Sequence, residues 1–195
     1  MSHPNPPVPA VPAVRSILVA LMMAIFLGAL DQTIVAVSMP AISARFNDVN
    51  LLAWVISGYM VAMTVAVPIY GKLGDLYGRR PMMLIGMGLF TLASVFCGMA
   101  QSMEQLVLAR VLQGIGAGGM ISVSQAIIDD IIPPRERGRY QGYFSSMYAA
   151  ASVIGPVLGG YMTEYLSWRW VFLINIPLGA GAWWVAHCRR RSASR

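Results

Sequence analysis

The chain has 195 residues, of which 57% are hydrophobic and 11% are charged, and its formal net charge is +6. Soluble domains carry roughly 25% charged residues, so this composition excludes an ordinary soluble globular protein and favours a membrane protein. The basic excess needs no nucleic-acid partner, because cytoplasmic loops of membrane proteins are rich in Lys and Arg. We therefore expect membrane lipid around the chain and no nucleic acid.

Charged residues divide the chain into six apolar runs of similar length. They cover 16–39, 49–71, 81–103, 111–128, 140–163 and 170–188. The last five hold 18 to 24 residues each, and at about 1.5 Å per helical residue this length matches the ~30 Å hydrocarbon core of a bilayer. The pattern predicts an all-α membrane protein with six transmembrane helices.

The first run follows a Pro-rich start with a single basic residue, Arg15, and contains Asp31, so we expect a retained helix and not a cleaved signal peptide. Residues 1–13 are then a Pro-rich cytoplasmic tail, 14–188 a six-helix transmembrane unit and 189–195 a basic cytoplasmic tail. A charge in lipid costs several kcal/mol unless it is paired, hydrated or neutralised, so Asp31 is expected to have a function.

The link between the second and third runs, 71–81, reads GKLGDLYGRRP. Its charges alone fit the ordinary bias towards basic cytoplasmic loops. The whole pattern, however, resembles the signature loop of the major facilitator superfamily of secondary transporters. The matching residues are Gly71, Asp75, Gly78, Arg79 and Arg80. The resemblance implies a cytoplasmic gating loop whose carboxylate and arginines make helix-end and salt-bridge contacts that hold one access state closed.

Arg110 lies about six residues from the outer end of the fourth helix, and Asp31 lies nine residues before Pro40 at the outer end of the first. By helical rise these depths are roughly 9 Å and 13 Å, so we expect the two charges to pair across the bundle, directly or through water. The alternative is a snorkelling Arg110 that reaches the outer interface.

Two further patterns follow in the fourth run. The segment GIGAGG, 114–119, fits a dinucleotide-binding fingerprint but lacks the preceding strand, so we interpret it as a site of close helix packing. The pattern R-x-x-Q-G at Arg110, Gln113 and Gly114 resembles the superfamily's fourth-helix motif, in which the arginine is linked to proton transfer.

The fifth run contains Gly155, Pro156, Gly159 and Gly160, which favour close packing and a helix kink. This glycine-proline motif resembles that of the exporting, antiporter branch of the superfamily. In the sixth segment, SWRWVFLINIPLG, the tryptophans suit an interfacial belt. Together with LDQTIVAVSMP in the first run, it resembles the drug:proton antiporters with fourteen spans.

Basic residues lie mostly at one end of the predicted helices. With a cytoplasmic N-terminus, eleven of the fourteen are on the cytoplasmic side, and only Arg45, Arg110 and Arg169 lie on or near the other side. The sequence therefore predicts a multi-pass protein of the cell membrane, either a plasma membrane or a cell inner membrane, with both termini in the cytoplasm.

The resemblance implies the N-terminal half of a major facilitator fold and proton-coupled multidrug efflux. Asp31 would be the proton-binding acid and Arg110 its electrostatic partner. The energy source would be a proton gradient and not a cofactor, and the substrate an amphipathic or cationic organic molecule. Because such transporters have two halves, we expect a truncated chain that needs the missing C-terminal half or a second copy.

Other residues and functions remain as alternatives. The chain could be a self-standing six-span protein that forms a homodimer, or a partner-binding regulator without transport. Glu164 is a second acid candidate, although we expect it to be an exposed loop glutamate. Asp129 and Asp130 are expected to be solvated or paired. The two histidines and two cysteines form no catalytic or metal-ligand pattern, so we expect neither an enzyme nor a metal site.

Overall fold

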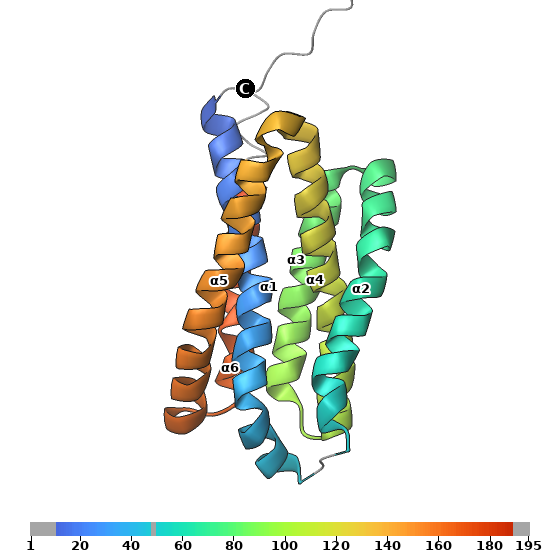
Figure 1. Cartoon of the computed structure of the whole chain (residues 1–195). Coiled ribbons are helices and arrows are strands. Elements are labelled where there is room, and N and C mark those ends of the chain that lie inside the picture. Colours follow the sequence, from blue (N-terminus) through green and yellow to red (C-terminus); the bar gives the residue numbers. More distant parts are fainter. Residues whose placement is uncertain (1–10, 48–49, 189–195) are drawn as a thin grey trace, which may run out of the picture.

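The computed structural model of the chain describes residues 11–47 and 50–188, which form seven helical segments. They are α1 (Val11–Phe46), α2 (Leu52–Tyr77), α3 (Arg79–Met99), α4 (Met103–Ile131), α5 (Pro134–Tyr165), α6 (Trp170–Leu173) and α7 (Asn175–Cys188). The helices run up and down along a common direction and are joined by short links (Figure 1). The two predicted tails lie outside the described residues, apart from residues 11–13.

Within the described residues, four helices are long and apolar enough to cross a bilayer: Leu18–Phe46 of α1, and α2, α3 and α4. The fifth helix is longer than most of them, but serine, tyrosine, glycine and proline interrupt its apolar residues. The expected sixth span is divided at Ile174 into α6 and α7. Pro177 has no N–H to donate to the carbonyl of Leu173, which weakens the helix at this point. The fifth and sixth spans therefore remain predictions.

Helix α1 does not end at Pro40, as the sequence analysis expected, but continues to Phe46. Pro40 lies on the exposed side of the helix, whereas Met39 and Ile42 beside it are buried. The packing of these neighbours keeps the chain helical past the proline, although proline removes one backbone hydrogen bond.

The predicted gating loop at 71–81 is not a loop. Helix α2 continues through Gly71 and Asp75 to Tyr77, and α3 begins at Arg79. The whole connection is Gly78, whose φ of +96° is strained for any residue with a side chain. A single glycine is therefore enough to reverse the chain, and the charges of the motif lie on helix ends.

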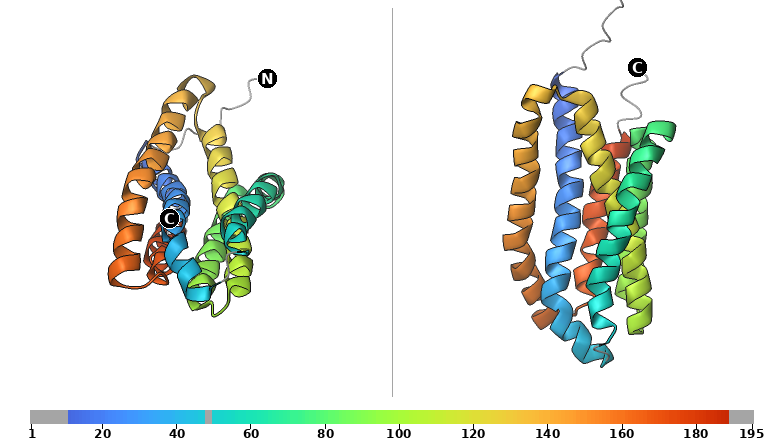
Figure 2. Two further views of the ribbon diagram at one scale, coloured as in Figure 1. Left: turned by 60° about the horizontal axis from the view of Figure 1, so that its bottom comes forward. Right: turned by 45° about the vertical axis from the view of Figure 1, so that its right-hand side comes forward.

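The helices associate in two groups. Helix α4 packs along α2 and α3, and α1 packs along α5, while α7 contacts both α1 and α3. The views in Figure 2 show the α1–α5 pair on one side of the bundle and α2, α3 and α4 on the other. The two groups are therefore joined mainly through the interior, where α1, α3, α4 and α7 meet.

Glycines explain why α4 approaches its neighbours so closely. A Cβ atom on Gly116 would lie 2.6 Å from the backbone nitrogen of Phe90 in α3, and one on Gly118 would lie 2.5 Å from the carbonyl oxygen of Met63 in α2. Small residues allow this distance between helix backbones. The interpretation of 114–119 as a helix-packing segment is therefore confirmed.

Candidate functional site

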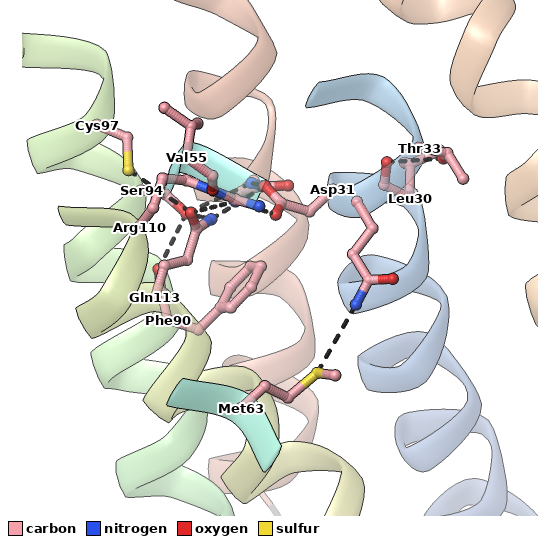
Figure 3. Close-up of polar contacts among 12 residues, drawn as sticks. Leu30, Asp31, Thr33, Val55, Met63, Phe90, Ser94, Cys97, Arg110 and Gln113 are labelled. Atoms are coloured by element: carbon pink, nitrogen blue, oxygen red, sulfur yellow. Dashed lines mark hydrogen bonds and ion pairs between the residues drawn. The ribbon is translucent and has the colours of Figure 1, made fainter. Parts of the chain in front are cut away.

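Asp31 of α1 and Arg110 of α4 form an ion pair inside the bundle. The guanidinium Nη1 lies 2.5 Å from the carboxylate Oδ2, and the side chains are 2% and 0% exposed, respectively. Figure 3 shows the two side chains pointing towards one another from facing helices. The burial of Arg110 contradicts the alternative in which it snorkels to the outer interface.

Three nitrogen donors surround the Asp31 carboxylate. Arg110 donates to Oδ2, and Oδ1 accepts from Gln113 Nε2 at 3.0 Å and from Asn175 Nδ2 at 2.6 Å. These donors come from α4 and α7, so the carboxylate joins helices of both groups. Both oxygens of this buried carboxylate therefore have hydrogen-bond donors.

The Arg110 guanidinium also has several partners. Its Nε donates to the carbonyl of Val55 in α2 at 3.3 Å, and Nη1 donates to Gln113 Oε1 at 2.7 Å. Its Cζ lies 4.0 Å from the ring centre of Tyr59 and 5.9 Å from that of Phe172. The acceptors and aromatic faces together compensate for the loss of hydration around a buried cation.

Helix α3 contributes the remaining polar contacts. Ser94 Oγ accepts from Gln113 Nε2 at 2.8 Å and from Asn175 Nδ2 at 3.4 Å, and Cys97 Sγ donates to Gln113 Oε1 at 3.6 Å. Cys97 is a free, buried thiol in this cluster. We call Asp31, Ser94, Arg110, Gln113 and Asn175 the polar core; it draws on α1, α3, α4 and α7.

The sequence analysis named Asp31, Arg110 and Gln113, but it missed Ser94, Tyr59 and Asn175. Asn175 had a usable signal, because it is an amide inside the apolar run 170–188, where the argument applied to Asp31 also holds. Ser94 gave no signal, since a single serine hydroxyl is common in membrane helices and bonds easily to its own helix. Tyr59 gave none either, because it contacts Arg110 through its ring.

A second charged cluster lies where α2, α3 and α4 approach one another at the Gly78 end of the bundle. Arg79 contacts Asp75 at 2.7 Å and Asp130 at 3.1 Å, and Arg137 contacts Asp129 at 3.4 Å. All of these side chains are between 27% and 63% exposed. The gating-motif residues Asp75 and Arg79 are thus brought together with Asp130, which no motif had linked to them.

Arg137 also caps the C-terminal end of α4 with its side chain. Its Nη2 donates to the carbonyl of Asp129 at 2.8 Å and its Nε to the carbonyl of Ile132 at 3.2 Å. A cation at a helix C-terminus satisfies carbonyls that have no partner within the helix. The sequence analysis expected Asp129 and Asp130 to be solvated or paired, and both are paired, Asp129 with Arg137 and Asp130 with Arg79.

The glycine-proline motif of α5 has two different sides. A Cβ on Gly155 would collide with the side chain of Thr33 in α1, and one on Gly159 would lie 3.0 Å from the carbonyl of Ile34. Pro156 is exposed, and a Cβ on Gly160 would meet nothing within 4 Å. Of the four motif residues, only Gly155 and Gly159 therefore pack against α1.

The remaining expectations concern acids and metals. Glu164 is exposed near the end of α5 and does not belong to the polar core. Among residues 11–47 and 50–188, no three His, Cys, Asp or Glu side chains gather closely enough to hold a metal ion.

Residues 21–194 match the family model described as Major Facilitator Superfamily. The chain is 43% identical over 166 residues to Multidrug resistance protein 3 of Bacillus subtilis and 42% identical over 166 residues to Multidrug transporter protein MdtP of the same organism. It is 42% identical over 162 residues to Efflux pump dotC of Dothistroma septosporum. These alignments cover 83–85% of this chain and 28–32% of the relatives, so the chain spans about a third of their length.

Solved transporter structures share the fold. A bacterial homologue of the human lysosomal transporter Spinster, inward-facing and unoccupied, superimposes with a TM-score of 0.73 at 22% identity, over 91% of this chain and 42% of that one. A D-xylose-proton symporter superimposes with a TM-score of 0.78 at 15% identity, over 89% of this chain and 48% of that one. At these identities the likeness establishes the fold alone.

Proposed function

The chain belongs to the major facilitator superfamily, as its motifs indicated, and from this premise we propose that it is the N-terminal six-helix part of a proton-coupled multidrug efflux transporter. The observation that carries the proposal is the buried pair of Asp31 and Arg110. The names of the relatives, two multidrug proteins and an efflux pump, support export as the direction and drugs as the cargo.

Asp31 is the proton-binding acid of the proposed transporter. A proton-driven exporter needs a group whose protonation changes the relative stability of two access states. Asp31 lies on α1 and its cationic partner on α4, which belong to different helix groups. Protonation removes the negative charge that holds Arg110 against α1, so it weakens the attachment between the two groups.

The cluster of Asp75, Arg79 and Asp130 acts as the cytoplasmic gate of the proposed transporter. Its ion pairs join the ends of α2, α3 and α4 and are partly exposed, so each contributes little energy and can break during a transport cycle. Gly71, Gly78 and Arg80 complete the motif. Gly155, Pro156, Gly159 and Gly160 support export, because their motif resembles that of the antiporter branch.

The proposed protein is a multi-pass component of a plasma membrane or a cell inner membrane, with both termini in the cytoplasm. The start of α1, the end of α7 and the link between α2 and α3 lie at the same end of the bundle (Figure 2), which agrees with that orientation. Cargo in this family is bound between two halves, so the pathway is completed by a C-terminal half or a second copy. The cargo is an amphipathic or cationic organic molecule.

A chimera tests the proposal. The chain replaces the matching segment of Bacillus subtilis Multidrug resistance protein 3, and efflux of ethidium, an amphipathic cation, is measured in cells with and without a proton gradient. We expect gradient-dependent efflux that Asp31→Asn abolishes and Glu164→Gln leaves intact. Efflux that persists in Asp31→Asn would overturn the assignment of the acid. In a second experiment the 195-residue chain is expressed alone. Ethidium efflux by this chain would favour the alternative in which it is a self-standing six-span protein.

A further inference from the structure

The contacts of Asp31 suit a carboxylate and not a carboxylic acid. Its described hydrogen-bond partners, Arg110, Gln113 and Asn175, all donate to it. On protonation, one oxygen becomes a donor and needs an acceptor, because a buried donor without one has lost its hydrogen bond to water and gained none in return. If Asp31 takes up a proton, the polar core must therefore supply an acceptor.

Most acceptors near Asp31 are already occupied. Gln113 Oε1 accepts hydrogen bonds from Arg110 Nη1 and Cys97 Sγ. Ser94 Oγ accepts from the side-chain amides of Gln113 and Asn175. Two buried atoms that can accept have no hydrogen-bond partner among the described residues: Tyr59 Oη and Asn175 Oδ1. Of these two residues, Asn175 is the one whose side chain already forms a hydrogen bond with the Asp31 carboxylate. Asn175 is 0% exposed, so bulk water does not reach this oxygen.

The position of Asn175 allows its amide to turn. It is the first residue of α7, directly after the interruption at Ile174, and its Nδ2 lies 2.6 Å from Asp31 Oδ1. The terminal torsion of an asparagine amide is broad and roughly two-fold, so a half turn exchanges Oδ1 and Nδ2 without moving the backbone. The same side chain can therefore donate to the carboxylate or accept from the acid.

We propose that Asn175 is a positioning residue for proton binding, whose amide donates to the Asp31 carboxylate and, after protonation, rotates so that Oδ1 accepts the new O–H. This inference rests on the proposed role of Asp31 as the proton-binding acid. It adds that a change in the protonation of Asp31, on α1, changes the orientation of the Asn175 amide at the start of α7, where the sixth span is interrupted.

The titratable groups near Asp31 come from four other helices. Arg110 of α4 is the cation, and Tyr59 of α2 and Cys97 of α3 lie in the same cluster. Tyr148 of α5 interacts electrostatically with Tyr59. Helix α6 and residues 175–181 of α7 contain no titratable side chain. Phenols and thiols ordinarily titrate in the alkaline range, so these neighbours keep their protons during acidification.

Infrared difference spectroscopy of the 195-residue chain in lipid tests the proposal, with carboxyl-¹³C aspartate to identify the acid band. Asp31→Asn assigns the band to Asp31. Gln113→Met and Asn175→Leu each remove one donor to Oδ1 of Asp31. Only Asn175→Leu also removes Asn175 Oδ1, the proposed acceptor of the new O–H. We expect Gln113→Met to bind the proton about tenfold more tightly, which moves the midpoint of the pH titration about one unit higher. The wavenumber of the acid band should not change.

For Asn175→Leu we expect a midpoint within about threefold of the unmodified chain, because both forms of the acid lose a partner, and a band at higher wavenumber, because the O–H has no acceptor. An Asn175→Leu band at its original position, with a midpoint like that of Gln113→Met, would show that Asn175 only donates and would overturn the proposal. A band missing at every pH in the unmodified chain would overturn the role of Asp31, and this inference with it.

A second measurement keeps the test valid if Asn175→Leu does not fold. Side-chain-¹³C asparagine in the unmodified chain should give an amide carbonyl shift on acidification, since Oδ1 gains a hydrogen bond, and Asp31→Asn should remove that shift. An amide band that does not respond while the Asp31 band appears would equally overturn the proposal.

Discussion

Arg79, the first residue of α3, lies 3.1 Å from Asp130 near the end of α4, and the same guanidinium contacts Asp75 of α2 at 2.7 Å. A motif that is continuous in the sequence is thus completed by a residue 51 positions away. The contact fixes the ends of three helices relative to one another, and it is open enough to solvent to be reversible.

We predict a small but measurable coupling between Arg79 and Asp130. Arg79→Gln and Asp130→Asn should each lower the stability of the purified chain, with a coupling of about 0.2–1 kcal/mol in a double-mutant cycle, because the pair is partly solvated. The cycle is measured by tryptophan fluorescence during denaturant unfolding in detergent. Additive single effects would show that the contact contributes nothing to stability.

The buried pair should behave differently. Arg110→Met leaves the Asp31 carboxylate buried without its cation, and we expect a loss of about 3–5 kcal/mol in the free energy of unfolding. Adding Asp31→Leu should recover much of this loss, because no unpaired charge then remains. The same unfolding assay measures both variants, and a double variant as unstable as the sum of its parts would contradict the prediction.

Two glycines of one motif offer a matched comparison. Gly155→Ala places a methyl group against Thr33, whose hydroxyl donates to the carbonyl of Ala151 at 3.0 Å, so it should separate α5 from α1 and cost about 1–3 kcal/mol. Gly160→Ala meets nothing within 4 Å and should not destabilise the chain. Thermal unfolding in detergent compares the two, and equal losses would refute the assignment of the packed side.

The connection between α2 and α3 should depend on Gly78 alone. With φ at +96°, Gly78→Ala should cost about 1–3 kcal/mol in backbone strain. Gly74→Ala is the control, since its Cβ would make only an ordinary contact with Arg79 at 3.5 Å inside a helix, where alanine is favoured. If denaturant unfolding shows no difference between the two variants, the single-residue turn is not the feature that limits stability.

The sequence alone was sufficient for the class of protein, the family and the main charged pair. The lengths of the apolar runs are fixed by the thickness of the bilayer, so they can be counted without a structure. The cost of a charge in lipid then requires a function or a partner for Asp31, and Arg110 at a comparable depth was the available cation. The motifs supplied the family, which the match over residues 21–194 established.

Only the tertiary structure decided where the helices end and which neutral groups complete the site. Helix α1 passes Pro40 and α2 continues into the expected loop because buried neighbours and backbone hydrogen bonds, and not the limits of a charge-free run, determine a helix end. Ser94 and Asn175 join Asp31 because the close approach of α1, α3, α4 and α7 brings their polar atoms within bonding distance. An uncharged polar residue is tolerated in many positions along an apolar helix, so its partner depends on contacts between helices that are far apart in the sequence.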